Sequence, residues 1–276
     1  MKPPPKKRFG QHFLRDTGIL DRLERVIRPS AEDYMVEIGA GDGTLSVRLA
    51  RSAGRFTAIE VDSDQMPALE STLAQFPGAK AMQGDILGID LDAFLSDSYG
   101  ESRRVRFAGN LPYNIATAII HRLLRLKKPV VDMTFMVQLE VAQRIVASPG
   151  SRTFGYLSLD CQHRSEVGIC MKVAPACFVP RPKVMSAVLT FKPRGVSSDT
   201  KLDICFDDLV KAAFAHRRKT LSNSLRRHPG FGPVAESLLM EAGIDRLRRA
   251  EDLSLSEYER LAGICHSCFM TRPPRE

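Results

Sequence analysis

Short apolar runs alternate with segments of helical periodicity over the first 150 residues of the chain. Runs of this length that border polar or glycine-rich turns are typical of buried parallel strands, which are apolar on both faces. Five such runs lie at residues 34–38, 56–60, 80–84, 105–109 and 131–137. Helical patterns lie at residues 17–28, 44–52, 63–75, 116–126 and 139–147. The alternation predicts an α/β fold, in which helices cover both faces of a parallel sheet.

The pattern changes after residue 150. Two strand-like runs at residues 168–173 and 185–191 flank a proline-rich segment, and helical patterns then continue to residue 264. Ser254 and Glu257 have the spacing of a capping box before the last helical pattern. We therefore predict an α/β domain at residues 1–198 and a small helical domain at residues 199–276.

The composition is that of an ordinary globular protein that can bury a core. Of its 276 residues, 43% are hydrophobic and 26% are charged. No apolar stretch approaches the roughly 18–20 residues that a membrane span requires, and no apolar signal region follows residues 1–8. We expect a cytoplasmic protein with no membrane partner. No large apolar stripe calls for a dimer, so we also expect a monomer.

The net charge indicates the kind of binding partner, and the cysteine pattern bears on whether the chain binds a metal. The net charge of +8 indicates an anionic partner such as nucleic acid. Basic residues exceed acidic ones by 17 to 12 in residues 181–276, a denser excess than the 23 to 20 of residues 1–180. Cys265 and Cys268 form a single CxxC with no second ligand pair, so we expect reduced thiols and no metal site.

A glycine-rich turn follows the first predicted strand directly. Residues 37–43 read Glu-Ile-Gly-Ala-Gly-Asp-Gly and lead into a helix. Glycines at positions 39, 41 and 43 let the backbone turn tightly and let a ligand approach it closely. The spacing is not the GxGxxG of dinucleotide-binding proteins, because position 44 is Thr.

Acidic side chains end the next two predicted strands. Glu60 stands where a carboxylate can accept both hydroxyls of a ribose, and Asp85 stands where it could accept from an adenine amino group. Acids in these places do not suit a pyrophosphate. Together with Gly39, the pattern therefore favours S-adenosylmethionine (SAM) over a nicotinamide cofactor. The alternative is an ordinary glycine turn with acids at the surface.

The fourth predicted strand runs into Asn110-Leu111-Pro112-Tyr113. The exocyclic amine of adenine is a poor nucleophile, because its lone pair is delocalised into the ring. The Asn110 side-chain oxygen and the Leu111 carbonyl could accept its protons, Pro112 would stiffen the turn, and Tyr113 could stack on the base. SAM carries its own leaving group, so positioning can suffice without a strong base. The alternative is a turn that uses Asn and Pro for local geometry.

Phe178 lies in a proline-rich segment at residues 175–187. A rigidly held phenylalanine could cover the second face of a flipped base. The alternative is a plain connection in which Phe178 is a core residue.

A basic segment at residues 211–228 contains no acid. On a helix, Phe214, Leu221 and Leu225 would face inward and leave a phosphate-binding surface on the other side. The candidate RNA-binding residues are Arg217, Arg218, Lys219, Arg226 and Arg227. A solvated charged face is the alternative. Two further acid-free basic groups are Arg122, Arg125, Lys127 and Lys128, and an N-terminal arm with Lys2, Lys6, Lys7 and Arg8.

Seven motifs in this order resemble the ribosomal RNA adenine dimethyltransferase family, most closely its KsgA-type small-subunit enzymes. The resemblance runs from Lys6 to Leu261. Its carriers are residues 8–14 (Arg-Phe-Gly-Gln-His-Phe-Leu), 37–43, 59–62 (Ile-Glu-Val-Asp), 83–85 (Gln-Gly-Asp), 110–113, 178–187 (Phe-x-Pro-x-Pro-Lys-Val-x-Ser-Ala) and 214–221 (Phe-x-x-Arg-Arg-Lys-Thr-Leu).

The resemblance implies a Rossmann-like SAM-dependent methyltransferase domain and an RNA-binding helical domain. It implies transfer of methyl groups from SAM to N6 of two adjacent adenines in the 3′-terminal hairpin loop of 16S rRNA. The implied substrate is an immature small ribosomal subunit, late in ribosome biogenesis, and the cofactor product is S-adenosyl-L-homocysteine.

The resemblance also implies a role for each candidate residue. His12, which stands where relatives often have Asn, and Leu14 would close over the cofactor. Gly39 would touch its methionine part, Glu60 its ribose and Asp85 its adenine. Asn110 would straddle the cofactor and the target amine, while Tyr113 and Phe178 would sandwich the target base.

Three other functions remain as alternatives. A resistance-type relative dimethylates one adenine of large-subunit rRNA, but the segments at residues 178–187 and 214–221 favour the small-subunit enzyme. A non-catalytic assembly checkpoint would bind the immature subunit and merely retain the cofactor pocket. A nicotinamide oxidoreductase lacks support, because the chain has no hydride-transfer constellation.

Overall fold

The computed structural model describes residues 11–98, 104–195 and 200–270. The chain divides into two compact units. The α/β unit comprises Met1–Ala142 and Ser165–Val196, and the helical unit comprises Gln143–Arg164 and Ser197–Glu276. The chain passes from the α/β unit to the helical unit twice, and the second passage, after Val196, lies two residues before the boundary predicted at residue 198. The sequence pattern gave no sign that residues 143–164 belong to the helical unit.

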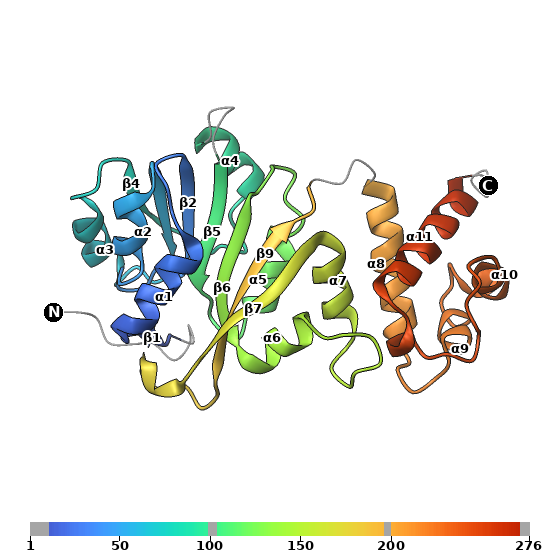
Figure 1. The fold of residues 1–276 in the computed structure, drawn as a ribbon. Helices are drawn as coiled ribbons and strands as arrows, with labels where there is room; N and C mark the ends of the chain where they lie inside the picture. Colours follow the sequence, from blue (N-terminus) through green and yellow to red (C-terminus); the bar gives the residue numbers. More distant parts are fainter. Residues whose placement is uncertain (1–10, 99–103, 196–199, 271–276) are drawn as a thin grey trace. The chain divides into compact units, whose positions relative to one another are not determined.

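The α/β unit is built on a seven-stranded sheet in the order β4-β3-β2-β5-β6-β9-β7 (Figure 1). Its parallel part comprises β2 (Asp33–Ile38), β3 (Arg55–Glu60), β4 (Ala79–Gln83), β5 (Arg104–Asn110) and β6 (Asp132–Gln138). The antiparallel edge comprises β7 (Ser165–Val173) and β9 (Ser186–Pro193). The five parallel strands agree with the predicted runs to within one residue, because strands buried on both faces are apolar along their length.

Helices lie on both faces of this sheet, as predicted; in Figure 1, α1 crosses in front of it and α5 lies behind it. They are α1 (Thr17–Ile27), α2 (Ser46–Ser52), α3 (Met66–Leu73), α4 (Leu91–Ser98), α5 (Ala116–Leu123) and α6 (Leu139–Ile145). The carboxylate of Asp16 caps α1 by accepting from the Ile19 amide at 2.9 Å. Leu20, Leu23 and Ile27 then recur at helical spacing and bury one face of that helix. The sequence analysis did not predict α4.

The strand order creates a crevice at the carboxyl ends of β2 and β5. The chain runs from β2 outward through β3 and β4, and then returns to place β5 on the other side of β2. Ligands bind at such a switch point in open α/β sheets. A Cβ at Gly109 would lie 2.3 Å from the Ile38 carbonyl oxygen, so β5 can approach β2 this closely only with glycine there.

A small antiparallel pair lies outside the main sheet. β1 (Phe13–Leu14) pairs with β8 (Phe178–Val179), with Leu14 opposite Phe178. The pair joins the N-terminal segment to the proline-rich segment, although Leu14 and Phe178 lie 164 positions apart (178 − 14).

The helical unit packs five helices around one apolar core. They are α7 (Tyr156–Arg164), α8 (Thr200–Phe214), α9 (Leu221–Leu225), α10 (Ala235–Glu241) and α11 (Leu255–Met270). Phe154 and Leu159 are buried in the same cluster as Phe206 and Leu209 of α8, which explains why residues 143–164 belong to this unit. The capping box before α11 is confirmed, because the Glu257 carboxylate accepts from the Ser254 amide at 2.7 Å and the Ser254 hydroxyl accepts from the Glu257 amide at 3.3 Å.

The basic segment at residues 211–228 is not one helix, which corrects the prediction. α8 ends at Phe214, a turn follows, and α9 begins at Leu221. Thr220 caps α9 through its hydroxyl, which accepts from the Asn223 amide at 3.4 Å, and this restarts the helix. Leu221 and Leu225 are buried, as predicted, and Phe214 is partly buried against the same core.

Candidate active site

One cleft at the carboxyl ends of the parallel strands gathers most of the predicted site residues. It encloses about 810 Å³ of empty space, part of it open to solvent. Its walls come from the N-terminal segment, the glycine turn and the ends of β3, β4 and β5. The residues that line it are Gln11, His12, Phe13, Gly39, Gly41, Glu60, Val61, Asp85, Asn110, Leu111, Pro112, Tyr113, Asn114 and Ile115.

The glycine turn needs its glycines for two reasons. Gly39, Gly41 and Gly43 have φ of +71°, +56° and +78°, a region that strains residues with a side chain. At Gly41 a Cβ would also lie 2.6 Å from the Phe13 ring. The turn therefore presents bare backbone to the cleft, with the N-terminal segment resting on it.

Glu60 lies at the floor of the cleft and holds the glycine turn. Its Oε2 accepts from the Gly41 amide at 2.7 Å, and its Oε1 accepts from the Asp62 amide at 2.9 Å. The side chain is 5% exposed, and burial raises the pKa of its carboxyl. Asp85 differs in being exposed, and its Oδ1 accepts from the Leu87 amide at 2.9 Å.

The N-terminal segment is fastened across the cleft by contacts that the sequence analysis missed. Gln11 donates from Nε2 to Oδ2 of Asp62 at 3.0 Å, and the Arg15 guanidinium pairs with Asp42. The partners of each pair lie 51 and 27 positions apart. Residues this far apart in the sequence cannot be paired from local spacing. The only sequence signal was the presence of two acids, Asp42 in the glycine turn and Asp62 after β3, which need hydrogen-bond donors as partners.

Asn110 and Tyr113 are both held in place from outside their own strand. Asn110 donates from Nδ2 to the His12 carbonyl at 2.7 Å, which leaves Oδ1 as the acceptor atom of that amide. The Tyr113 hydroxyl shares a hydrogen bond with Ser186, and its ring lies against the His12 imidazole with centroids 5.4 Å apart. Burial raises the pKa of Tyr113, so the hydroxyl stays protonated at neutral pH.

Phe178 is not brought into this cleft. Its ring is 2% exposed and belongs to the apolar cluster that contains Leu14, Leu20 and Leu23. Strand alternation explains the placement, because β8 turns Phe178 inward and Val179 outward. In this structure Phe178 is a core residue, the alternative noted for it from the sequence, and it does not face Tyr113.

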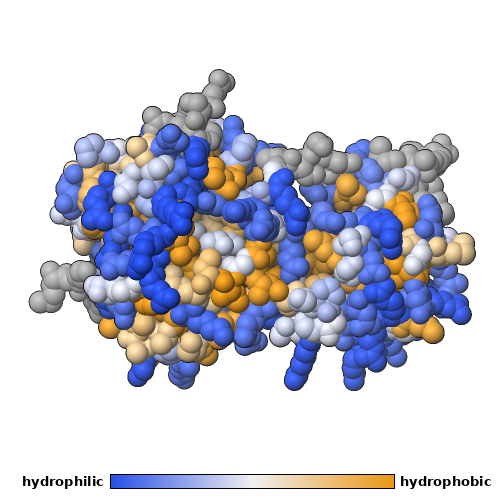
Figure 2. Space-filling model, in the orientation of Figure 1, coloured by the Kyte–Doolittle hydropathy of each residue, from blue (hydrophilic) through white to orange (hydrophobic). Residues whose placement is uncertain are grey.

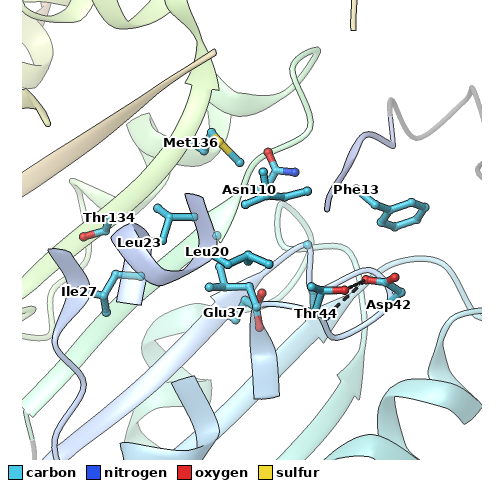
Figure 3. A pocket seen from close by; sticks show the side chains of 15 residues that line it. Phe13, Leu20, Leu23, Ile27, Glu37, Asp42, Thr44, Asn110, Thr134 and Met136 are labelled. Atoms are coloured by element: carbon cyan, nitrogen blue, oxygen red, sulfur yellow. Dashed lines mark hydrogen bonds between the residues drawn. The ribbon is translucent and has the colours of Figure 1, made fainter. Parts of the chain in front are cut away.

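A second cavity of about 480 Å³ adjoins the cleft and shares Phe13, Gly39 and Asn110 with it (Figure 3). Apolar side chains of α1 and Leu14 form much of its wall. Figure 3 also shows the hydrogen bond from Thr44 to Asp42, at 2.7 Å, on its far side.

Glu37 is a buried acid in the wall of this cavity that the sequence analysis did not single out. It is fully buried and accepts from the Ser46 hydroxyl at 2.5 Å. Burial raises the pKa of the Glu37 carboxyl to about 8, so this acid is mostly neutral at pH 7. Its place at the end of β2, directly before the glycine turn, was the available sequence signal.

The predicted RNA-binding residues divide into two groups. Arg217 donates to Glu251 at 2.7 Å and to the Phe154 carbonyl at 3.1 Å, and Arg226 pairs with Glu236. Both side chains are exposed, but Arg217 also binds backbone carbonyls and so links separate segments of the helical unit, whereas the Arg226–Glu236 pair lies at the surface. The other three are exposed and form no ion pair with any described residue: Arg218, Lys219 and Arg227.

The two other predicted basic groups offer fewer exposed cations among the described residues. The Arg122 guanidinium donates to the carbonyls of Leu87 and Ile89, and Arg125 donates to the His121 carbonyl at 3.1 Å. Lys127 is exposed. The N-terminal arm with Lys2, Lys6, Lys7 and Arg8 lies outside the described residues, as does the side chain of Cys268.

Within residues 11–98, 104–195 and 200–270, no helix is both long and apolar enough to cross a membrane. In the same ranges, no three side chains of the metal-binding types lie together.

Comparisons with known proteins agree along nearly the whole chain. The family model described as ribosomal RNA adenine dimethylase matches residues 4–266. A ribosomal RNA small subunit methyltransferase A from Chromohalobacter salexigens is 38% identical over 268 residues, which cover 95% of this chain and 92% of that protein. The protein of the same name from Legionella pneumophila is 40% identical over 263 residues, covering 95% and 98%.

Solved structures share the fold. A dimethyladenosine transferase from Plasmodium falciparum superposes with a TM-score of 0.78 at 22% identity, over 91% of this chain and 96% of that one. The 23S rRNA methyltransferase ErmE superposes with a TM-score of 0.69 at 23% identity, over 91% and 98%. The Rossmann-like methyltransferase architecture predicted from the sequence is thereby confirmed.

Proposed function

Because the chain belongs to the ribosomal RNA adenine dimethylase family and is an rRNA adenine dimethyltransferase of the small-subunit type, we propose a specific reaction for it. The protein transfers methyl groups from SAM to N6 of two adjacent adenines in the 3′-terminal hairpin loop of 16S rRNA. It acts as a cytoplasmic monomer on the immature small subunit, late in ribosome biogenesis. The observation that carries this proposal is the single cleft that joins the glycine turn, Glu60 and Asp85 to Asn110 and Tyr113.

The residues at the cleft floor fit SAM. Gly39 lines the cleft with φ of +71° and no side chain, so the methionine part can lie against its backbone. The Glu60 carboxylate has about four acceptor positions and binds three backbone amides, which leaves it able to accept from a ribose hydroxyl. Asp85 is exposed at the outer end, where the adenine amino group would reach it. Bound SAM would supply a methyl group on positively charged sulfur and leave as S-adenosyl-L-homocysteine.

Asn110 and Leu111 would orient the target amine. The hydrogen bond to His12 fixes the Asn110 amide so that Oδ1 can accept one amine proton, and the Leu111 carbonyl accepts the other. Holding the amine in line with the methyl group supplies most of what this reaction needs, because the leaving group is already activated. Pro112 restricts the turn that carries both acceptors.

Tyr113 would stack on the extruded adenine. A base in a single-stranded loop can be splayed out cheaply, and an aromatic face then holds it. Stacking on the face that now meets the His12 ring requires the imidazole to move aside. Phe178 could complete a sandwich only after β8 shifts, since its ring is buried here.

The helical unit would bind the surrounding RNA backbone. Of the five predicted cations, Arg218, Lys219 and Arg227 are exposed without a described acidic partner and so available for phosphates, while Arg217 and Arg226 already pair with Glu251 and Glu236. Affinity that depends on phosphate contacts should fall steeply with salt.

The test is methyl transfer from labelled SAM to undermethylated small subunits, with large subunits and naked rRNA in parallel. The methylated nucleosides are identified by mass. We expect dimethyladenosine from small subunits alone. Labelling of large-subunit RNA would assign the chain to the resistance-type activity. Tight subunit binding without transfer would favour an assembly checkpoint.

A further inference from the structure

The segment at residues 179–185, between β8 and β9, combines exposed apolar and basic side chains. We call it the 179–185 rim. Val179, Val184 and Met185 are 55%, 44% and 38% exposed. Arg181 and Lys183 alternate with them, are exposed, and form no ion pair with any described residue. Large apolar side chains gathered beside free cations at one place are unusual for a surface that meets only water.

The rim stands next to the cleft and is anchored there. Nδ1 of His12 lies 2.7 Å from the Pro180 carbonyl oxygen, and the Leu139 amide donates to the Met185 carbonyl at 2.9 Å. The Tyr113 hydroxyl bonds Ser186, the residue directly after the rim. Tyr113, which is predicted to stack on the target adenine, therefore contacts the residue next to the rim, and Asn110 is linked to the rim through His12.

The charge around the rim favours a polyanion. No acidic residue occurs between Glu166 and Asp199, whereas this stretch contains Lys172, Arg181, Lys183, Lys192 and Arg194. In Figure 2, tan and orange side chains mix with blue ones along the lower left edge, where Figure 1 draws the yellow segment after β7. A basic stretch with no acid of its own is complementary to a phosphate backbone, although Asp16 and Glu140 of other segments lie near its two ends.

The apolar part favours nucleotides over inorganic anions. β8 alternates so that Phe178 points into the core and Val179 points outward. Apolar side chains such as Met, Ile and Pro pack against unstacked bases where proteins open a nucleic acid. Base extrusion creates such unstacked neighbours directly beside the extruded nucleotide.

On this basis, and resting on the proposed function, we propose that the 179–185 rim is an RNA-binding surface of the α/β unit. Arg181 and Lys183 bind phosphates that flank the target adenine, and Val179 and Met185 pack against the bases next to it. The α/β unit thus holds the reactive loop itself and contributes to the choice of target independently of the cations in the helical unit.

The charged part is tested with the double variant Arg181→Gln, Lys183→Gln. Its matched control is Arg22→Gln, Lys80→Gln, which removes the same charge from two exposed residues that do not line the cleft. We expect the rim variant to raise KM for undermethylated small subunits about tenfold with unchanged SAM affinity. Its plot of log(kcat/KM) against log salt should become shallower by roughly 1.4, because each single-strand phosphate contact adds about 0.7.

The apolar part is tested with Val179→Ser, Met185→Gln. This variant should also raise KM for the subunit while leaving the salt slope at its wild-type value, since no cation is lost. If both rim variants behave like the Arg22, Lys80 control, the rim is not an RNA surface. A wild-type protein that transfers no methyl group to any RNA would instead contradict the proposed function, so the two failures are distinguishable.

Discussion

Asn110 depends on three separate parts of the chain for its position. It ends β5, and the neighbouring Gly109 lets that strand approach β2 closely. Its amide is then oriented by the carbonyl of His12, which the β1–β8 pair holds over the cleft. The side chain is therefore preorganised before any substrate arrives, which is what a reaction that relies on positioning requires.

Replacing Asn110 should separate chemistry from cofactor binding. In Asn110→Ala we expect transfer to fall by about two to three orders of magnitude, by analogy with removal of one preorganised hydrogen-bonding group. SAM affinity should change by no more than about threefold, since the glycine turn, Glu60 and Asp85 remain. Calorimetric titration with SAM and the labelled-methyl assay measure the two effects.

The exposed Asn223 on α9 offers a control with the same chemical change, and Asn223→Ala should keep both properties. If Asn110→Ala lost SAM binding and transfer in equal measure, its main role would be to hold the N-terminal segment through His12.

The turn between α8 and α9 shows how one basic motif serves two purposes. Arg217 reaches across to Glu251 and to the carbonyl of Phe154, and so ties three segments of the helical unit together. The next two residues, Arg218 and Lys219, are exposed and have no acidic partner among the described residues. Charge alone, read along the sequence, does not distinguish these positions.

Charge reversal should reveal this division. In Arg218→Glu, Lys219→Glu, Arg227→Glu we expect weaker small-subunit binding, a salt slope reduced by roughly 2 to 3, and unchanged SAM affinity and thermal stability. Binding assays across a salt series measure the slope. Unchanged subunit binding would show that this turn is not the RNA surface.

Arg217→Glu is the structural comparison. It places a second carboxylate against Glu251 and leaves carbonyl groups without a donor, so we expect a lower melting temperature of the helical unit. If Arg217→Glu instead kept its stability and lost only RNA binding, the assignment of Arg217 to the fold would be wrong.

Across the whole molecule, we expect the stabilities of the two units to depend on pH in opposite directions. Burial raises the pKa of Glu37 in the α/β unit from 4.5 to about 8, and burial also raises the pKa of Glu60. In the helical unit, the hydrogen bonds from Arg248 lower the pKa of Glu257 to about 2. Between pH 4.5 and 8 the folded α/β unit keeps a proton on Glu37 that the unfolded chain has released.

The stability of the α/β unit should therefore fall as pH rises through this window. Each pKa unit corresponds to roughly 1.4 kcal/mol, so the loss of unfolding free energy is on the order of a few kcal/mol. Glu37→Gln keeps an acceptor for Ser46 without a titrating proton, and should remove most of the dependence, with Glu60 accounting for the remainder. Urea unfolding without cofactor, followed by circular dichroism at about pH 5 and about pH 8.5, measures it.

The helical unit provides the opposite trend within the same chain. Glu257 contributes stability that is present above about pH 4.5 and is lost as pH falls toward 2.

For the α/β unit, equal unfolding free energies at about pH 5 and about pH 8.5 in the wild-type protein would contradict the raised pKa of Glu37.

The sequence by itself determined the fold class, the five parallel strands and the order of the chemical motifs. These features follow from local properties: apolar runs, helical spacing, and glycines that permit a turn after a strand. Because the carboxyl ends of parallel strands share one edge, the same reasoning placed Gly39, Glu60, Asp85 and Asn110 in one cleft, where the structure has them.

The burial of side chains and their pairing with residues far away in the sequence became known only from the tertiary structure. It buried Phe178 in the core, gave Arg217 a partner in Glu251, and assigned residues 143–164 to the helical unit. By burying Glu37, and to a lesser extent by placing Glu60 and Asp42 near it, the fold also raised the pKa of its carboxyl to about 8. Burial and pairing are set by side chains that lie tens of positions away in the chain, and no local pattern encodes which of them will meet.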